Sequence, residues 1–129
     1  MDKLNSFDEY KRRQKMLHML DTTYNRDINK FKDAVNNTDL HELVKYMKYR
    51  DLRKAGHDVV AEARFAYGRG RADIFDITEG IAYEVVMTEK EESILRKKQR
   101  YPVPIEVVYV EEYLKTNKFL HKITWQYRL

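Results

Sequence analysis

The sequence predicts a mixed α/β fold, in which a four-stranded mixed sheet is flanked by helices and preceded by a long N-terminal helix. Three observations support this. Apolar residues recur at helical spacing over the first third of the chain, three short apolar segments separated by turn residues follow, and a charged helical segment precedes a fourth apolar segment. A meander of strands before a crossover helix implies both antiparallel and parallel pairing. We expect one domain over residues 1–129, with a helical extension at 1–38 and an αβββαβ nuclease-like core at 39–129.

The first helix is expected over residues 6–36. The motif "SFDE" at its start is a capping box, and four large apolar residues recur every seven positions to form one stripe: Tyr10, Leu17, Tyr24 and Phe31. This stripe is long for so small a domain, and such a helix often packs against a symmetric copy of itself. We therefore expect a homodimer that uses the first helix.

The remaining elements follow from local signals. A second helix is predicted from Leu40 to about Ala55, with Asp39 and Glu42 at its cap and Gly56 at its end. Strands are predicted at 57–65, 71–77, 81–87 and 103–110, and a helix that begins near Thr88 connects the last two. The tail, residues 119–129, is expected to form a last strand.

Composition narrows the classes of function. The chain has no cysteine, which excludes disulfides and thiolate zinc sites, and no apolar run approaches the roughly 20 residues of a membrane span. The N-terminus lacks the apolar segment of a signal peptide. We expect an intracellular, cytoplasmic protein with no membrane partner. Its net charge of +4 permits an anionic partner such as nucleic acid.

Three carboxylates interrupt the apolar strands: Glu62, Asp73 and Glu84. A buried carboxylate must be paired or bind a metal, so each acid either meets an arginine at a sheet end or belongs to a site. Asp73 and Glu84 share a face if the turn between their strands has an even number of residues, and lie on opposite faces if it has three. If they converge, these hard oxygen donors suit Mg²⁺ or Mn²⁺, with the backbone carbonyl of Val85 as a third ligand.

The segments "HELVK", "LRKAGHDVVAE", "GRADI" and "YEVV", between residues 41 and 86, resemble the PD-(D/E)XK nuclease superfamily. The likeness extends over about residues 40–110 and is greatest to small archaeal and viral members related to Holliday junction resolvases. It implies a restriction-endonuclease-like fold, Mg²⁺ or Mn²⁺ as cofactor, and DNA or RNA as substrate, in the host cytoplasm if the protein is viral. Asp73 matches the metal-binding aspartate, Glu84 the glutamate of the E-x-K element, and Glu62 an upstream acid that some members carry.

Two positions depart from the family pattern. Ala72 replaces a frequent proline, and Val86 replaces the lysine that orients the attacking water. A lysine from another element must then supply the charge, and we expect Lys45 on the second helix to do so, ahead of three lysines of the later helix: Lys90, Lys97 and Lys98. The expected nucleic-acid contacts are His41, Arg69, Arg71, Lys97 and Lys98.

The sequence thus favours a metal-dependent endonuclease that acts on DNA rather than RNA. Asp73 and Glu84 would hold the metal, while Glu62 and Lys45 would assist catalysis. Two alternatives remain open. The chain is a nucleic-acid-binding protein that kept the fold and lost the chemistry, or it is an assembly protein built around the N-terminal helix.

Overall fold

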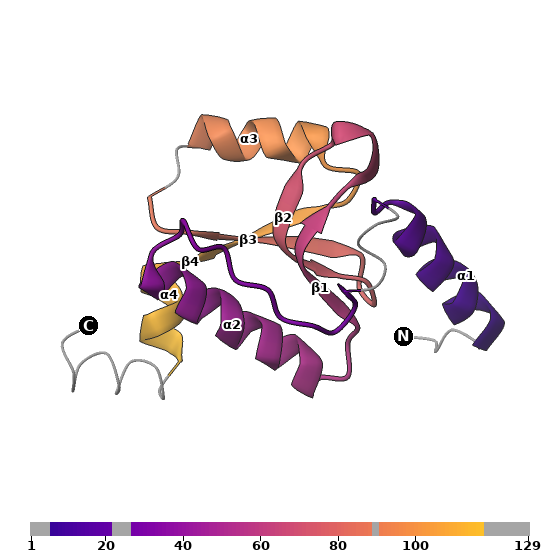
Figure 1. The fold of residues 1–129 in the computed structure, drawn as a ribbon, viewed down its shortest axis with the longest axis horizontal. Helices are drawn as coiled ribbons and strands as arrows, with labels where there is room; N and C mark the ends of the chain where they lie inside the picture. The colour runs from indigo at the N-terminus through magenta and orange to yellow at the C-terminus, as the bar shows by residue number, and fades with distance from the viewer. Residues whose placement is uncertain (1–5, 22–26, 89–90, 118–129) are drawn as a thin grey trace.

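A computed structural model describes residues 6–21, 27–88 and 91–117, and it contains a four-stranded sheet with helices on both faces (Figure 1). The strands lie in chain order: β1 (Val59–Arg64), β2 (Arg71–Asp76), β3 (Ile81–Val86) and β4 (Ile105–Tyr109). The first three are antiparallel, and β4 runs parallel to β3 after the crossover helix α3 (Glu91–Arg100). The predicted mixed α/β fold is therefore confirmed.

Helix α2 (Asp39–Lys54) agrees with the predicted second helix. Its N-cap is Thr38 rather than Asp39, since the Thr38 hydroxyl accepts a hydrogen bond from the backbone N–H of His41 at 3.2 Å. The helix stops where Gly56 adopts a φ of +85°, a conformation that glycine tolerates best. Local capping chemistry thus determines both ends of this helix.

The first helix is shorter than predicted. Helix α1 covers only Ser6–His18, and the stretch 27–38 is irregular, so the single helix over 6–36 was wrong. After α1 the chain pairs with the end of β1 instead: Leu20 bridges to Phe65, and the Asp21 N–H donates to the Arg64 carbonyl at 2.9 Å. Burial of Leu20 in the core outweighs continuation of the helix. Tyr24 lies outside the described residues.

The apolar stripe of α1 is only partly covered by the sheet. No residue of α1 is fully buried, and Met16 and Leu17 alone pack against the core from this helix. Phe7 and Tyr10 are 63% and 60% exposed. The homodimer stays a prediction, and substitution of these two exposed side chains can test it.

The chain after β4 was also predicted incorrectly in part. The strand ends at Tyr109, and a short helix, α4 (Val110–Thr116), follows directly. Sequence analysis missed this helix, in which Val110 is buried against Val44 and Val85. The last strand expected at 119–129 lies outside the described residues.

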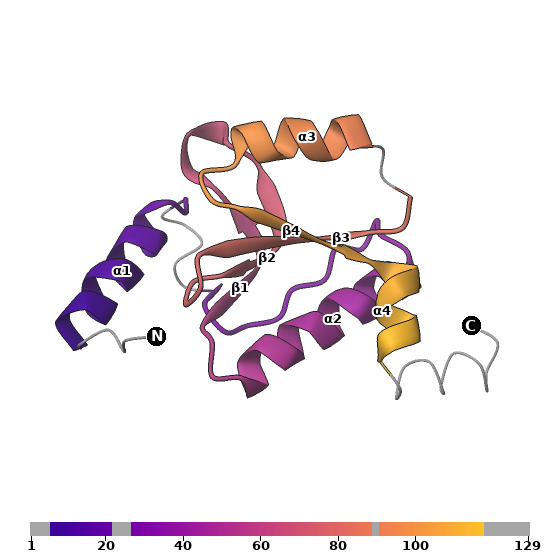
Figure 2. The same cartoon turned by 180° about the vertical axis from the view of Figure 1, so that it is seen from behind.

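The two sheet faces have separate cores. Seen from behind in Figure 2, α2 and α4 cover one face and α3 lies over the other. The α3 side is filled around Phe75 and Tyr101, whereas the α2 side is filled around Ile74 and Tyr83. This division follows from side chains that alternate between faces along each strand. Within the described ranges, no helix combines the length and apolarity needed to cross a membrane.

Candidate functional site

The register of β2 and β3 places Asp73 opposite Glu84. Ile74 pairs with Tyr83 and Phe75 with Ala82, so Asp73 and Glu84 occupy the next positions of the two strands, with the Asp73 carboxylate near His41 of α2 and the Glu84 carboxylate near Lys97 of α3. The turn between the strands has four residues, 77–80, so the even-numbered alternative is the correct one. Both acids line one surface hollow of about 300 Å³, which His41, Arg71 and Lys97 also line.

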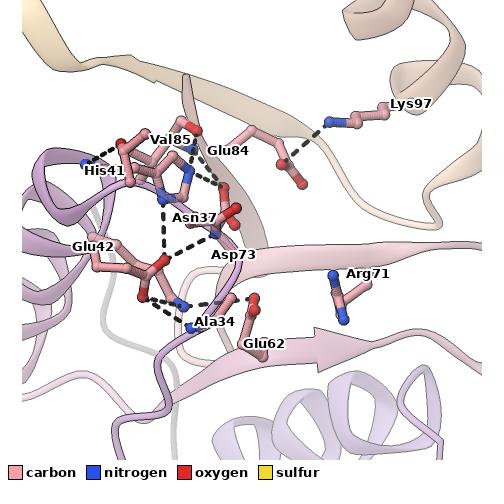
Figure 3. Close-up of polar contacts among 12 residues, drawn as sticks. Ala34, Asn37, His41, Glu42, Glu62, Arg71, Asp73, Glu84, Val85 and Lys97 are labelled. Atoms are coloured by element: carbon pink, nitrogen blue, oxygen red, sulfur yellow. Dashed lines mark hydrogen bonds and ion pairs between the residues drawn. The ribbon is translucent and has the colours of Figure 1, made fainter. Parts of the chain in front are cut away.

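Asp73 is held on the side of the hollow next to α2. One carboxylate oxygen accepts a hydrogen bond from the Val85 backbone N–H at 2.8 Å. The same oxygen lies 3.6 Å from Nε2 of His41. The Asp73 side chain is 15% exposed and therefore reachable from solvent. Figure 3 shows Asp73 close to His41 and Val85, while Glu84 points toward Lys97.

His41 has an acceptor at each ring nitrogen. Its Nδ1 lies 3.1 Å from a carboxylate oxygen of Glu42, and its Nε2 lies 2.7 Å from the Val85 carbonyl oxygen. With only the protein present, both nitrogens must carry protons to satisfy these contacts. The pKa of His41 is accordingly raised from 6.5 to about 9, chiefly by the nearby Asp73 carboxylate and against the opposing effect of burial. His41 is thus an imidazolium that joins Asp73 to the Val85 carbonyl.

The same arrangement is typical of a metal-binding histidine. Such residues usually donate one ring N–H to a carboxylate, which orients the other nitrogen toward the metal. Glu42 occupies that carboxylate position. Glu42 is itself anchored by the backbone N–H of Ala34 at 3.1 Å and the side-chain amide of Asn37 at 2.9 Å. His41 is therefore a candidate metal ligand as well as the phosphate contact expected from the sequence.

Glu84 is held by Lys97, in the last turn of α3, and by Tyr101, directly after the helix. It is 5% exposed, and the Tyr101 hydroxyl donates to its Oε1 at 2.5 Å, while Lys97 Nζ lies 3.5 Å from Oε2. Lys97 and Tyr101 are four residues apart, and the Tyr101 N–H donates to the Lys97 carbonyl, so both side chains face β3. Burial and the neighbouring Glu84 carboxylate raise the pKa of Tyr101, so the hydroxyl keeps its proton and donates it.

Gly70 permits this position of Tyr101. A Cβ atom on Gly70 would lie 2.5 Å from the Tyr101 ring, and the backbone there has a φ of +115°. The Tyr101 hydroxyl also lies 2.6 Å from the Arg71 carbonyl oxygen. Both the conformation and the lack of a side chain therefore require glycine at this point.

Glu62 and Lys45 form a separate, more buried pair. Lys45 is fully buried, donates to Glu42 at 3.1 Å and lies 3.6 Å from Glu62. The pKa of Glu62 is raised, because burial outweighs the attraction of Lys45. Glu62 lines a neighbouring hollow of about 320 Å³ rather than the one that holds Asp73. Lys45 thus neutralises the buried Glu62 and the half-buried Glu42, and its catalytic role stays a prediction.

The remaining predicted residues are divided between the site and the surface. Arg71 lines both hollows, whereas Arg69 and Lys98 are exposed. Sequence analysis gave no role in the site to Tyr101 or Glu42. Their spacing from residues it did single out, four after Lys97 for Tyr101 and three before Lys45 for Glu42, was the available signal.

The donor atoms near Asp73 fit the divalent metal that the family resemblance implies. Among the described residues, no three side chains of His, Asp or Glu are grouped closely enough to hold a metal, and Glu84 contacts Tyr101 and Lys97 instead. The Asp73 carboxylate, the Val85 carbonyl and the His41 nitrogen nevertheless converge, with the carbonyl in place of a third side chain. An imidazole nitrogen makes this set better suited to Mn²⁺ than to Mg²⁺.

Comparison with known proteins adds no assignment. No family model, curated protein or solved structure matches the chain. The functional argument therefore depends on the topology of the sheet and on the contacts within the site.

Proposed function

We propose that the protein is a metal-dependent nuclease of the PD-(D/E)XK type that hydrolyses phosphodiester bonds, with DNA as the favoured substrate. The observation that carries the proposal is the placement of Asp73 opposite Glu84 at a solvent-accessible hollow that Lys97 also lines. The order of elements supports it, because three antiparallel strands, a crossover helix and a parallel fourth strand match the core that the resemblance implies.

Each side chain has a distinct part in this proposal. Asp73, the Val85 carbonyl and His41, after loss of its Nε2 proton, would hold Mn²⁺ or Mg²⁺, and Glu84 would complete the set from the adjacent strand once it is released from Tyr101 and Lys97. A bound divalent ion supplies Lewis-acid stabilisation and a more acidic water. Glu42 orients His41 through its Nδ1.

Lys97 takes the place of the lysine that Val86 replaces. Its ammonium group lies 3.5 Å from Glu84, at the edge of the hollow where charge would develop on a phosphate. Arg71 lines the same hollow and offers a bidentate contact to a phosphate. The contacts thus favour Lys97 over Lys45, which is fully buried against Glu42 and Glu62.

A second candidate is a nucleic-acid-binding protein that has lost catalysis. The His41 imidazolium favours this reading, because it already joins Asp73 to the Val85 carbonyl without a metal. In that case the acids would be permanent partners of protein cations. The basic residues around the hollow would then bind nucleic acid without cutting it.

Cleavage assays with Mn²⁺ or Mg²⁺ on single-stranded, duplex and branched DNA, and on RNA, test the proposal. Asp73→Asn should abolish cleavage, and Lys97→Ala should reduce it by about 10²-fold, as loss of one charge-stabilising group does. Lys54→Ala is the control, since Lys54 is an exposed lysine at the C-terminal end of α2 that lines neither hollow, and it should cleave normally.

Lys45→Ala separates catalysis from folding. Removal of a buried cation that neutralises two acids should lower the melting temperature more than Lys97→Ala does, because Tyr101 still donates to Glu84 when Lys97 is absent. If the wild-type protein binds DNA in a salt-sensitive way but cleaves no substrate with either metal, the nuclease proposal is wrong. The non-catalytic nucleic-acid-binding protein would then be the better description.

A further inference from the structure

Two segments without acidic residues meet beside the site. Residues 63–72 and 93–105 contain no Asp or Glu, although the chain as a whole has 21 acids. These segments carry seven basic residues: Arg64, Arg69, Arg71, Arg96, Lys97, Lys98 and Arg100. Figure 1 shows the tip of the β1–β2 hairpin next to the end of α3, and the contact of Tyr101 with Gly70 and Arg71 joins them. We refer to this surface as the basic ridge.

The basic ridge leads into the hollow that holds the acids. Arg71 from the hairpin and Lys97 from α3 both line that hollow. A polyanion would be repelled by Asp73 and Glu84 alone, so it needs neighbouring cations to approach them. The ridge supplies these cations on the side of the hollow formed by the hairpin and α3.

Tyr67 is the aromatic residue at the tip of the ridge. It lies in the short turn Ala66–Gly68 between β1 and β2 and is 94% exposed. Its backbone has φ +61° and ψ +29°, a left-handed conformation that is costly for a bulky side chain. Asparagine adopts this conformation more readily. An aromatic ring that neither packs in the core nor suits its backbone indicates a role outside folding.

We infer that the basic ridge binds a single-stranded nucleic acid, with Tyr67 stacked on an unpaired base and Arg69 and the α3 cations next to phosphates. Exposed aromatics within a basic surface are the usual elements of single-strand binding. A duplex keeps its base faces stacked inside, so it has no free face for Tyr67. The inference rests on the proposed function for the class of ligand, but it does not require cleavage.

Binding of labelled oligothymidine of about 20 nucleotides, measured by fluorescence anisotropy in EDTA, tests this inference without cleavage. Tyr67→Asn should weaken binding by about tenfold, the equivalent of one lost base stack. The same variant should melt about 3 °C higher than wild type, because asparagine relieves the backbone strain. Loss of affinity with a gain in stability cannot result from unfolding. Tyr67→Phe keeps the ring and should bind like wild type.

Two further measurements define the ligand. Arg69→Gln should lower the slope of log affinity against log salt by about 0.7, the value for one phosphate contact on a single strand. Duplex DNA of equal length and polyglutamate should both compete poorly with oligothymidine.

Unchanged affinity in Tyr67→Asn, tighter binding of duplex, or equal competition by polyglutamate would overturn the inference. The nuclease proposal fails separately, when wild type binds oligothymidine but cleaves no substrate with Mn²⁺ or Mg²⁺.

Discussion

The charge on His41 should make the stability of the metal-free protein depend on pH in a defined way. The pKa of His41 is about 9 in the folded protein, against 6.5 for an unperturbed histidine. Since the folded value is the higher one, protonation favours the folded state. This stabilisation is fully present below pH 6.5 and is lost as the pH rises through 9. His41→Gln removes it at every pH.

The magnitude follows from the same contacts. A rise in pKa from 6.5 to about 9 corresponds to roughly 3 kcal/mol at about 1.4 kcal/mol per tenfold change. Solvent reaches part of the His41 and Asp73 side chains and screens the ion pair, which reduces the expected contribution to about 1–2 kcal/mol. The difference in free energy of unfolding between wild type and His41→Gln should therefore be about 1–2 kcal/mol larger at pH 6 than at pH 10, in favour of wild type.

Urea unfolding in EDTA, followed for both proteins between pH 6 and 10, measures this difference. His18→Gln serves as the control for the substitution itself, because His18 is exposed on α1 and does not line the hollow that holds Asp73. A difference between wild type and His41→Gln that stays constant with pH would refute the charged histidine. A difference that grows with pH would reverse the sign of the argument.

Two further predictions concern backbone conformation and assembly. Gly56→Ala should lower the free energy of unfolding by about 1 kcal/mol in urea titrations. A Cβ atom at this position meets no other atom, so only the φ of +85° opposes the substitution. An unchanged free energy of unfolding would contradict the role given to Gly56 at the end of α2. If the exposed Phe7 and Tyr10 form a dimer interface, the double variant with serine at both positions should be monomeric by light scattering where wild type is dimeric. Monomeric wild type at tens of micromolar would end the dimer prediction.

Elements with strong local signals were predictable from the sequence. Helix α2 begins and ends close to the positions that its cap and Gly56 indicate, and all four described strands lie within their predicted segments. The long first helix was not predictable in the same way. The bridge between Leu20 and Phe65 joins residues 45 positions apart, and no local pattern encodes it.

The site shows the same division. The sequence placed Asp73 and Glu84 on adjacent strands, but the register depended on a turn whose length it could not decide. It placed Glu62 with them, whereas a φ of +50° at Glu62 interrupts the alternation of β1, so that Val60 and Ala63 pack in the same core. The carboxylate of Glu62 instead faces Lys45 on α2.

By itself, the sequence determined the order of the four strands and the helices α2 and α3, and the identity of the carboxylates at the centre of the proposed site. Capping residues and the period of apolar side chains act over a few positions, so they can be read without a structure. Only the tertiary structure decided that His41 joins Asp73 to Val85 and that Lys97 and Tyr101 hold Glu84. These contacts arise when helices pack against the sheet, and they connect residues whose separation along the chain carries no signal.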